Sequence, residues 1–471
     1  MSTHTTTDRR EETRTEAFVG RCLAIDAGDL TEAADERAHT LVLDLLGVML
    51  GSAPATESSR IARDMVRAVY GDGGATVVGE PDGSPTPAAA FANGTIAHGI
   101  ELDDTHSGAS IHPGAVVVPT ALAVGETEGA SGEELLEAVV SGYECVVRVS
   151  RAADPAVLYA RGFHPTATCG VFGAALVAAR LKGLSFVETV NAVGLAGSFS
   201  AGNQEYLGSG SLSKRIQPGV AAQAGVQAAE LAARGYTGPE SILEGKNGFL
   251  TAYADGGDVD RLFADVDDEF EFEITRTGIK PHACCRYNQT PIDAALDIQR
   301  EHGLDVDDVG SISVGLVGPA MDIVAEPRDR KVRPKTATDA QFSLHYSVAV
   351  ALVTGQAFLE QFDDPYLSDE GVLAVANRVT AVHDESLDEF YPDFFPAEVT
   401  IETTDGQAYA TMLETCRGDP SNPLSAAFLD EKFRTLAGRS LDETGVEDLR
   451  ELAGDLHAVE DVSSLTAYLR G

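Results

Sequence analysis

The sequence predicts a mainly α-helical protein in which a large helical domain precedes a smaller α+β domain that acts as a lid. Apolar residues recur at helical spacing to about residue 265, alternating runs begin at about residue 266, and helical spacing returns after Pro423. We therefore expect a helical domain over 1–265 with a frayed start at 1–16, and an α+β domain over 266–420. Helices over 421–471 should pack back on the helical domain or close the second one.

The first helices are predicted by apolar spacing and by capping residues. Residues 31–51 and 58–70 both carry apolar side chains on one helical face. Residues 131–134 and 185–188 both fit the S-x-x-E capping box, in which each side chain satisfies an otherwise unpaired backbone N–H. Long helices should follow both motifs.

Two further stretches, residues 165–183 and 219–234, are dense in Ala and Gly. Because small side chains let helix backbones approach closely, both stretches are expected to be helices buried against other helices. The even spacing of all these segments predicts one large helical domain.

The second domain is predicted from short alternating runs between helical stretches. Residues 269–275 alternate at period two, and residues 399–403 lead through an Asp-Gly turn to a further run. Strands are expected at 269–275, 312–316, 399–403 and 408–413, with helices at 289–301 and 337–353. This order indicates a compact α+β unit.

The charge balance excludes several partners. The 471 residues include 74 Asp and Glu against 34 Lys and Arg, which gives a formal net charge of −40. Such a field repels phosphate backbones and lipid headgroups, so neither nucleic acid nor a membrane is expected as a partner. Only seven of the basic residues are lysines, and an acidic, lysine-poor surface keeps a protein hydrated in molar salt. We expect a high-salt cytoplasm; the alternative is an acidic protein with a cationic partner.

The cysteines and the N-terminus favour a reduced, cytoplasmic protein. The six cysteines show no C-x-x-C pair, so neither a disulfide framework nor a zinc ribbon is indicated. No apolar run reaches the roughly 18 residues of a membrane span. Residues 1–17 lack the apolar segment of a secretion signal, so the chain is expected to be soluble and unexported.

The densest polar cluster lies at residues 93–114, where three histidines and three carboxylates stand within fifteen residues. His and Asp are good ligands for divalent metals, but the spacing lacks the regularity of a closed site, so no metal is expected. The structural alternative is a turn in which Asp104 and Thr105 cap a helix beginning near Pro113. The six side chains are His98, Glu101, Asp103, Asp104, His106 and His112.

Two more segments carry polar groups just before predicted helices. His164 precedes Pro165, and the positive end of a helix dipole lowers the pKa of such a histidine and favours neutral imidazole. Residues 207–215 combine glycines and serines with Lys214, which suggests an anion-binding loop without the order of a nucleotide P-loop. A solvated lysine is the alternative at that position.

A fourth segment, residues 278–289, holds Lys280, His282 and Arg286 within a strongly acidic chain. These cations suggest a pocket for a carboxylate, because arginine suits bidentate pairing. The adjacent cysteines in this segment are expected to be buried thiols. Further on, Tyr346 opens an apolar helix, where it would either exchange a proton with an oxyanion or serve as a core tyrosine.

In this order, the five segments resemble the MmgE/PrpD family, which includes 2-methylcitrate dehydratase, cis-aconitate decarboxylase and iminodisuccinate epimerase. The resemblance spans nearly the whole chain, and the ordered set is specific although each segment alone is not. The residues that carry it are Asn93–Thr105, His112–Gly114, Gly162–Pro165, Ser213-Lys214, Lys280–Arg286 and Asp339–Leu344.

The resemblance implies a helical domain with a smaller α+β domain, a pocket between them, a homodimer, and no metal or organic cofactor. The catalytic residues it implies are His112, His164, Lys214 and Tyr346. The substrate-binding residues it implies are Glu101, Asp104, Thr105, Lys280, His282 and Arg286.

The implied activity is that of a lyase acting on a small di- or tricarboxylate, closest to 2-methylcitrate dehydratase. One histidine would remove the α-proton and the other would protonate the leaving hydroxyl, while Lys214 and Lys280 neutralise carboxylates. An epimerase or a decarboxylase on the same scaffold is the alternative. A non-catalytic acidic helical scaffold that binds a cationic partner is the alternative from another class.

Two positions depart from the family pattern. Glu101 stands where the family usually has an aspartate, one methylene shorter. Cys284, Cys285 and Arg286 stand where the decarboxylases carry a histidine after the lysine. Both departures count against 2-methylcitrate and cis-aconitate as the substrate.

Overall fold

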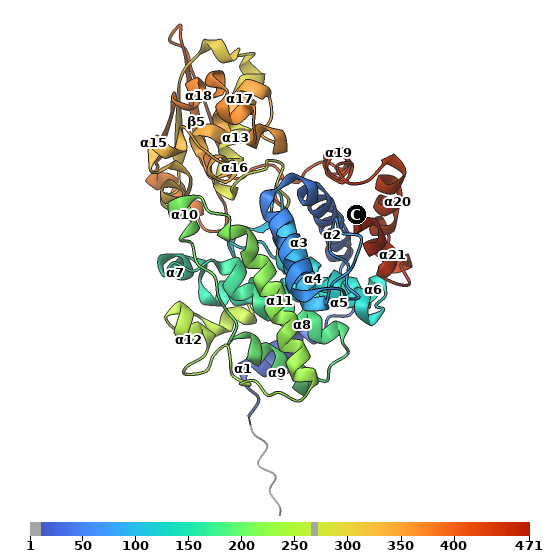
Figure 1. Ribbon diagram of the computed structural model, residues 1–471. Helices are drawn as coiled ribbons and strands as arrows, with labels where there is room; N and C mark the ends of the chain where they lie inside the picture. Colours follow the sequence, from blue (N-terminus) through green and yellow to red (C-terminus); the bar gives the residue numbers. More distant parts are fainter. Residues whose placement is uncertain (1–10, 265–271) are drawn as a thin grey trace, which may run out of the picture.

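The computed structural model describes residues 11–264 and 272–471, and it confirms a large helical domain with a smaller α+β domain. Figure 1 shows the α+β domain above the helical one, with the last helices at the side. The helices of the first domain are α1 (Arg14–Leu23), α2 (Glu32–Ala55), α3 (Glu57–Tyr70), α4 (Thr86–Ala97), α5 (Gly114–Glu128), α6 (Gly132–Ala153), α7 (Pro155–Ala160), α8 (Pro165–Leu181), α9 (Phe186–Ala196), α10 (Tyr206–Ser209), α11 (Ser213–Ala233) and α12 (Phe249–Ala254).

The predicted capping boxes begin two of these helices. At the start of α6, Ser131 accepts a hydrogen bond from the Glu134 backbone, and the Glu134 carboxylate accepts one from the Ser131 N–H at 2.8 Å. At the start of α9, Ser185 and Glu188 make the same exchange. Helices α6 and α9 therefore both start where the sequence predicts them.

The Ala- and Gly-rich helices α8 and α11 form the centre of the domain with α4 and α5. The crossing of α4 and α11 depends on two glycines, because a Cβ on Gly94 would lie only 2.8 Å from the Cα of Gly219. This close approach brings the end of α4, at His98, beside the first turn of α11, which carries Lys214.

Helix α2 runs through the interior, with 72% of its most apolar window buried, although its length and hydropathy match those of a membrane span. Of the C-terminal helices, α19 and α20 pack on α2 and α21 packs on α5, so they return to the helical domain. A Cβ on Gly51 would lie 2.8 Å from Leu436, which shows how closely α19 approaches α2. The C-terminal helices are α19 (Ala426–Ala437), α20 (Glu443–Gly454) and α21 (Ser463–Thr466).

The second domain contains a four-stranded sheet in the order β4-β3-β5-β6. Strands β3 and β4 are parallel, the other neighbours are antiparallel, and α13 and α17 pack against the sheet. The elements are β3 (Val309–Leu316), β4 (Val379–His383), β5 (Ala397–Thr403), β6 (Ala408–Leu413), α13 (Arg286–His302), α14 (Gly318–Ala320), α15 (Arg328–Lys331), α16 (Ala337–Gln341), α17 (Leu344–Thr354) and α18 (Glu370–Ala376).

Two sequence predictions in this domain need correction, and one element was not predicted. The strand expected at 269–275 falls partly outside the described residues, and Glu273–Arg276 forms a 3₁₀ helix. In the described part of this run, Glu273 is buried and pairs with Arg151 at 2.6 Å, so this charged residue does not face solvent. The helix expected at 337–353 is two helices, since Ser343 caps α17 by accepting from the Tyr346 N–H at 3.0 Å. Strand β4 is an element that the sequence did not predict.

A short ladder joins the polar cluster of the first domain to the start of the second. Strand β1 (Thr105–His106) pairs with β2 (Thr277–Gly278), so that Thr105 lies opposite Gly278. Because β2 stands two residues before Lys280, this pairing fixes Lys280 against the loop that carries Glu101.

The rare lysines and the cysteines are mostly internal. Four of the seven lysines are buried, whereas Lys246 and Lys335 are exposed. All six cysteines are buried and free, as the sequence predicts. The buried lysines are Lys214, Lys280, Lys331 and Lys432.

Candidate active site

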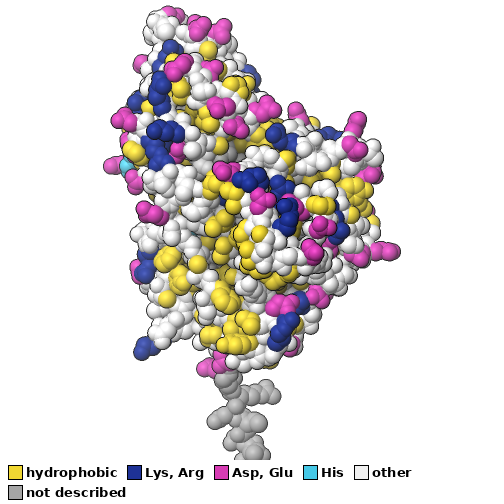
Figure 2. Space-filling model, in the orientation of Figure 1, with side chains coloured by type: hydrophobic (Ala, Val, Ile, Leu, Met, Phe, Trp, Pro, Cys, Tyr) yellow, Lys and Arg dark blue, Asp and Glu magenta, His cyan; other side chains and the backbone are white. Residues whose placement is uncertain are grey.

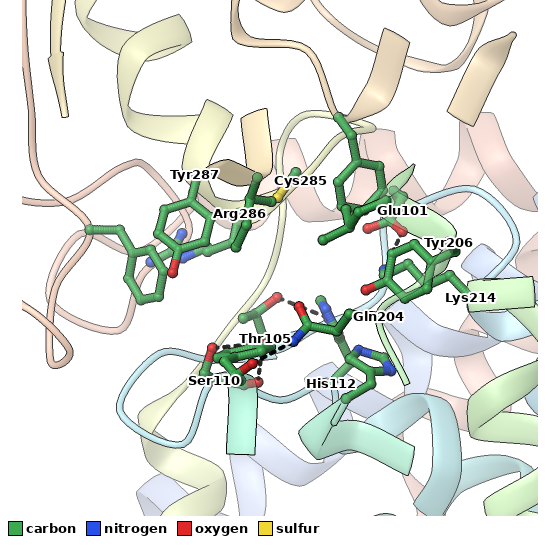
Figure 3. Close-up of a pocket in the computed structure, with 16 residues that line it drawn as sticks. Glu101, Thr105, Ser110, His112, Gln204, Tyr206, Lys214, Cys285, Arg286 and Tyr287 are labelled. Atoms are coloured by element: carbon green, nitrogen blue, oxygen red, sulfur yellow. Dashed lines mark hydrogen bonds and ion pairs between the residues drawn. The ribbon is translucent and has the colours of Figure 1, made fainter. Parts of the chain in front are cut away.

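A pocket lies between the two domains, with a cavity volume of about 50 Å³. The helical wall consists of Glu101, Thr105, Ser110, His112, Tyr159, His164, Gln204, Tyr206, Leu207 and Lys214. The α+β wall consists of Cys285, Arg286, Tyr287, Ile323, Phe342 and Phe395. Figure 3 shows Lys214, Tyr206 and Glu101 on one side of the hollow and Arg286 and Tyr287 on the other.

Glu101 is the electrostatic centre of this pocket. Its carboxylate accepts hydrogen bonds from Lys214, from Arg215 and, at 3.2 Å, from Lys280. Burial raises the pKa of Glu101, but the three cations outweigh that effect and hold the pKa well below its ordinary value. The backbone of Glu101 has a φ of 57°, a left-handed conformation that costs a residue with a side chain about 1 kcal/mol or more. Such strain persists where the surrounding contacts impose it, as these do.

Lys214 occupies the first turn of α11, where the helix dipole and the neighbouring Arg215 both disfavour a positive charge. The ammonium donates to Glu101 and to the Nε2 of His98, the latter at 2.8 Å. It also lies 5.1 Å from the ring centroid of Phe342 in the α+β wall. Burial lowers the pKa of Lys214 from its ordinary value, and Arg215 and Lys280 reinforce the shift. The ammonium therefore releases its proton more readily than an exposed lysine does.

The carboxylate of Asp103 links the loop to both lysines. One of its oxygens lies 2.6 Å from Nδ1 of His98 and 3.5 Å from Nδ1 of His112, and the other lies 3.7 Å from Lys280. Burial raises the pKa of Asp103, but these neighbours outweigh it and lower the pKa below the ordinary value. Asp103 is therefore ionised.

His98, Asp103 and His112 could together offer a metal ion three ligand atoms, all within 4.8 Å of one another. A metal there would compete with two ammonium groups, because Lys214 already holds His98 and Lys280 lies beside Asp103. Electrostatic repulsion between the two lysines and a divalent ion opposes such a site.

The two histidines of the helical wall stand at helix starts, as the sequence predicts. His164 is the N-cap residue of α8, and its Nδ1 lies 2.7 Å from the side-chain oxygen of Gln217. His112 precedes α5, and its Nδ1 lies 2.9 Å from the carbonyl oxygen of Asp104. Both partners accept, so Nδ1 carries the proton in each ring and Nε2 carries a lone pair.

Both imidazoles are neutral. Burial lowers the pKa of His164 to about 3, and the charge of Lys214 adds to that shift. Burial and the charge of Lys280 place the pKa of His112 well below its ordinary value. The two rings are consequently available as bases near neutral pH.

Arg286, at the start of α13, is the cation of the α+β wall. Its terminal nitrogens donate to Asp419 at 2.8 Å, to Ser107 at 3.2 Å and to Cys416. Its buried Nε has no hydrogen-bond partner among the residues that the structure describes. The guanidinium lines the pocket, and its positive charge favours a carboxylate there.

Tyr206 supplies a phenol to the helical wall, 6.1 Å from the ring of His164. Burial raises its pKa well above the ordinary value, so the hydroxyl stays protonated and able to donate. Figure 3 shows this hydroxyl directed into the hollow.

The structure brings most of the predicted residues together. Three of the four predicted catalytic side chains, His112, His164 and Lys214, line the pocket. Tyr346 does not, and that prediction needs correction. It lies on α17 and is fully buried, and its hydroxyl donates to the Gln361 carbonyl at 2.6 Å, so it is a core tyrosine.

Among the predicted substrate-binding residues, Glu101, Thr105 and Arg286 line the pocket, and Lys280 stands behind Glu101. Asp104 and His282 do not line it, which corrects the prediction for both. The carboxylate of Asp104 accepts from the Gly114 N–H at 3.1 Å, so it caps α5 as the structural alternative predicts.

His282 faces away from the pocket. Its Nε2 lies 3.1 Å from the carboxylate of Asp293, and the ring lines a different cavity together with Arg417. The chain bends at residues 281–284, so His282 faces away although Lys280, two residues earlier, contacts Glu101 behind the pocket.

Sequence reasoning missed Tyr159, Gln204, Tyr206 and Arg215. Tyr206 lies on the short helix α10, where a single aromatic residue carries no pattern. Arg215 follows Lys214 directly, and the pair of cations in an acidic chain was the one signal that could have identified it. The role of His98 also has no local signal, since it depends on α4 and α11 crossing.

Comparison with known proteins covers nearly the whole chain. The family model for the MmgE/PrpD N-terminal domain matches residues 17–262, and the model for the MmgE/PrpD C-terminal domain matches residues 282–458. The cis-aconitate decarboxylase-like protein oryM of Aspergillus oryzae is 29% identical, over 93% of this chain and 93% of its own. The cis-aconitate decarboxylase of Aspergillus terreus is 28% identical, over 94% and 92%. The cis-aconitate decarboxylase of Homo sapiens is 27% identical, over 97% and 94%.

Proposed function

Because the chain belongs to the MmgE/PrpD family, we propose that it is a cofactor-independent lyase that acts on a small di- or tricarboxylate. One observation carries the proposal. Lys214, the guanidinium of Arg286 and two neutral imidazoles all line a single pocket. Such a set can hold carboxylates and move protons without further chemistry.

The fixed charges of the pocket favour an anionic guest. Lys214, Arg215 and Lys280 bring three positive charges against two carboxylates, those of Glu101 and Asp103, while Arg286 pairs with Asp419. Carboxylates that enter between the two walls would reach the Arg286 N–H from one side and the Lys214 ammonium from the other. A low-dielectric pocket strengthens both contacts.

The tautomers of the histidines support proton abstraction next to a carboxylate. The Nε2 of His112 or of His164 would take the α-proton, the bond to the β-hydroxyl would break, and Lys214 would supply the proton that turns the departing hydroxide into water. The net change is loss of water from the substrate. In this scheme the acid is Lys214, whereas the sequence assigned that role to a histidine.

Decarboxylation is the second candidate reaction, and the relatives favour it, since those cited above are cis-aconitate decarboxylases or resemble them. A carbon–carbon bond would break to release CO₂, and the electron pair left on carbon would take a proton from Lys214. Both reactions use the same acid and the same carboxylate-binding groups.

Product analysis separates these reactions. The protein would be incubated in high salt with 2-methylcitrate, citrate, cis-aconitate or iminodisuccinate, and the products followed by proton NMR. Loss of water indicates a dehydratase, loss of CO₂ a decarboxylase, and inverted stereochemistry an epimerase. Turnover should persist after dialysis against a chelator. If no polycarboxylate reacts or binds, the lyase proposal fails and the acidic-scaffold alternative gains support.

We also propose that the chain forms a homodimer through an apolar face on α3 and α11. Val69 and Tyr70 of α3 and Ile216 of α11 are 67%, 40% and 40% exposed. Figure 2 shows hydrophobic side chains gathered where Figure 1 places these helices. Light scattering should give twice the chain mass of 49.4 kDa, and Val69→Asp should lower it. A monomeric wild-type protein in high salt would contradict this interface.

A further inference from the structure

His98 lies behind the pocket rather than in its lining, and its side chain is fully buried. Nδ1 is 2.6 Å from the carboxylate of Asp103, and Nε2 is 2.8 Å from the ammonium of Lys214. The backbone carbonyl of His98 accepts from Arg215 at 3.0 Å, which fixes the ring beside the start of α11. The ring is thus a bridge between one carboxylate and one ammonium.

The two partners determine the tautomer of this ring. An ionised carboxylate only accepts, so Nδ1 of His98 must carry the proton that is donated to Asp103. An ammonium only donates, so Nε2 must carry the lone pair that receives a hydrogen bond from Lys214. Burial lowers the pKa of His98, which agrees with a neutral ring.

An ammonium has three N–H groups, and the structure accounts for two of those on Lys214. Glu101 accepts one and His98 accepts another, while Lys214 itself lines the pocket. Because the three N–H directions are tetrahedral, fixing two of them fixes the third. We propose that His98, held by Asp103, is a positioning residue that directs the remaining N–H of Lys214 into the pocket. This inference rests on the proposed lyase function for its substrate, but the geometry at Lys214 can be tested separately.

The acceptor on His98 also stabilises the charged form of Lys214, so its removal should lower the pKa of that lysine. The effect can be isolated, since the other groups stay in place when His98 changes. The charged and titratable groups that face Lys214 are Glu101, Asp103, His112, His164, Arg215, Lys280 and Cys285.

Two substitutions separate the contacts of the ring. His98→Gln places an amide oxygen near the position of Nε2 and so keeps an acceptor for Lys214. His98→Asn places its amide near Nδ1, which keeps the contact with Asp103 and removes the acceptor. We expect kcat to fall about 10- to 100-fold in His98→Asn, the worth of a hydrogen bond to a charged group, with a smaller change in KM. His98→Gln should keep most of the activity.

The pH profile provides a signature that packing alone would not produce. Activity that requires the Lys214 ammonium is lost as pH rises through the pKa of Lys214. That alkaline limb should move to lower pH by about one unit or more in His98→Asn and should stay in place in His98→Gln.

A second readout needs no substrate. Cyanate carbamylates only the neutral form of an amine, so its rate against pH, followed by peptide mass spectrometry, reports the pKa of Lys214. The His98→Asn profile should shift to lower pH, while that of exposed Lys335 stays unchanged. In the wild-type protein, ¹⁵N NMR of the histidines should show Nδ1–H at His98. The opposite tautomer would overturn the inference even if no variant folds.

The outcomes distinguish this inference from the lyase proposal. If no polycarboxylate is turned over but the carbamylation profile shifts in His98→Asn alone, the lyase proposal fails and the role of His98 stands. If the enzyme is active but both variants lose kcat equally, with unmoved pH limbs, His98 only fills space and the inference is wrong.

Discussion

The two walls of the pocket differ in chemistry. The helical wall carries the groups that can exchange protons: His112, His164, Lys214 and the phenol of Tyr206. The α+β wall presents one guanidinium, that of Arg286, together with the thiol of Cys285 and the phenol of Tyr287, whose pKa values burial raises. We therefore expect proton transfer at the helical wall, with charge and shape contributed by the second domain. Substitutions in the two walls should therefore affect different kinetic constants.

The largest effect is expected from the helical wall. Lys214→Met removes the proposed acid, so kcat should fall about 10²- to 10⁴-fold, the usual contribution of general acid catalysis. Steady-state kinetics by NMR measures this, with exposed Lys335→Met as the matched control. A Lys214→Met enzyme that kept a tenth of its kcat would show that the acid lies elsewhere.

A substitution in the α+β wall should instead weaken substrate binding. Arg286→Lys loses the planar guanidinium that lines the pocket, so KM should rise about 10- to 100-fold while kcat changes less. The exposed Arg333→Lys serves as the control. A loss confined to kcat would contradict the division of labour between the walls.

Two tyrosines sharpen the comparison on a smaller scale. Tyr206→Phe removes a donor from the pocket, and kcat should fall up to about tenfold. Tyr346→Phe should leave kcat unchanged and lower the free energy of unfolding by about 1 kcal/mol, because its hydroxyl serves only the Gln361 carbonyl. Kinetics and denaturant unfolding of both variants test this, and an inactive Tyr346→Phe would restore the sequence prediction.

The smallest effect on kcat/KM is expected from lowering the pH. Burial lowers the pKa of both wall histidines, that of His164 to about 3, so they remain unprotonated where an ordinary histidine, with a pKa of about 6.5, becomes charged. After correction for substrate ionisation, kcat/KM should stay level from about pH 8 to about pH 5. A drop centred near the ordinary histidine value would mean that a wall histidine is exposed in the working enzyme.

The same two histidines lower the stability of the folded protein at acidic pH. The unfolded chain binds protons at these sites below about pH 6.5, whereas the folded protein does not. Folding is therefore weakened as pH falls through that value, and the kinetic measurement requires a parallel check that the protein stays folded.

The sequence predicted those pocket residues that lie in short, recognisable motifs. A histidine before a helix-starting proline and a lysine in a lysine-poor chain are visible in one segment, and His112, His164 and Lys214 all line the pocket. The capping boxes and the Ala- and Gly-rich helices are also local and were correctly predicted. These features depend on neighbours within a few residues.

The wrong predictions concern side chains whose orientation depends on contacts with distant segments of the chain. Tyr346 has the same local pattern whether it faces the pocket or the core, and only the packing of Gln361 places it in the core. Tyr206 has no pattern and reaches the pocket because α10 lies beside it. The alternation before Thr275 suggested a strand, yet Glu273 turns inward to an arginine of α6 that no local rule connects to it.

The pair formed by α19 and α2 has a consequence for how the molecule is made. Lys432 of α19 bonds the buried carboxylate of Asp44 at 2.7 Å and the Leu102 carbonyl at 3.2 Å, directly between Glu101 and Asp103. Lys432 is synthesised 330 residues after Leu102, the residue of the loop that it contacts. During translation the helices of the first domain can thus pack early. The contacts of Lys432 with Asp44 and Leu102, which hold the loop of Glu101 and Asp103, form only after almost all of the polypeptide has emerged.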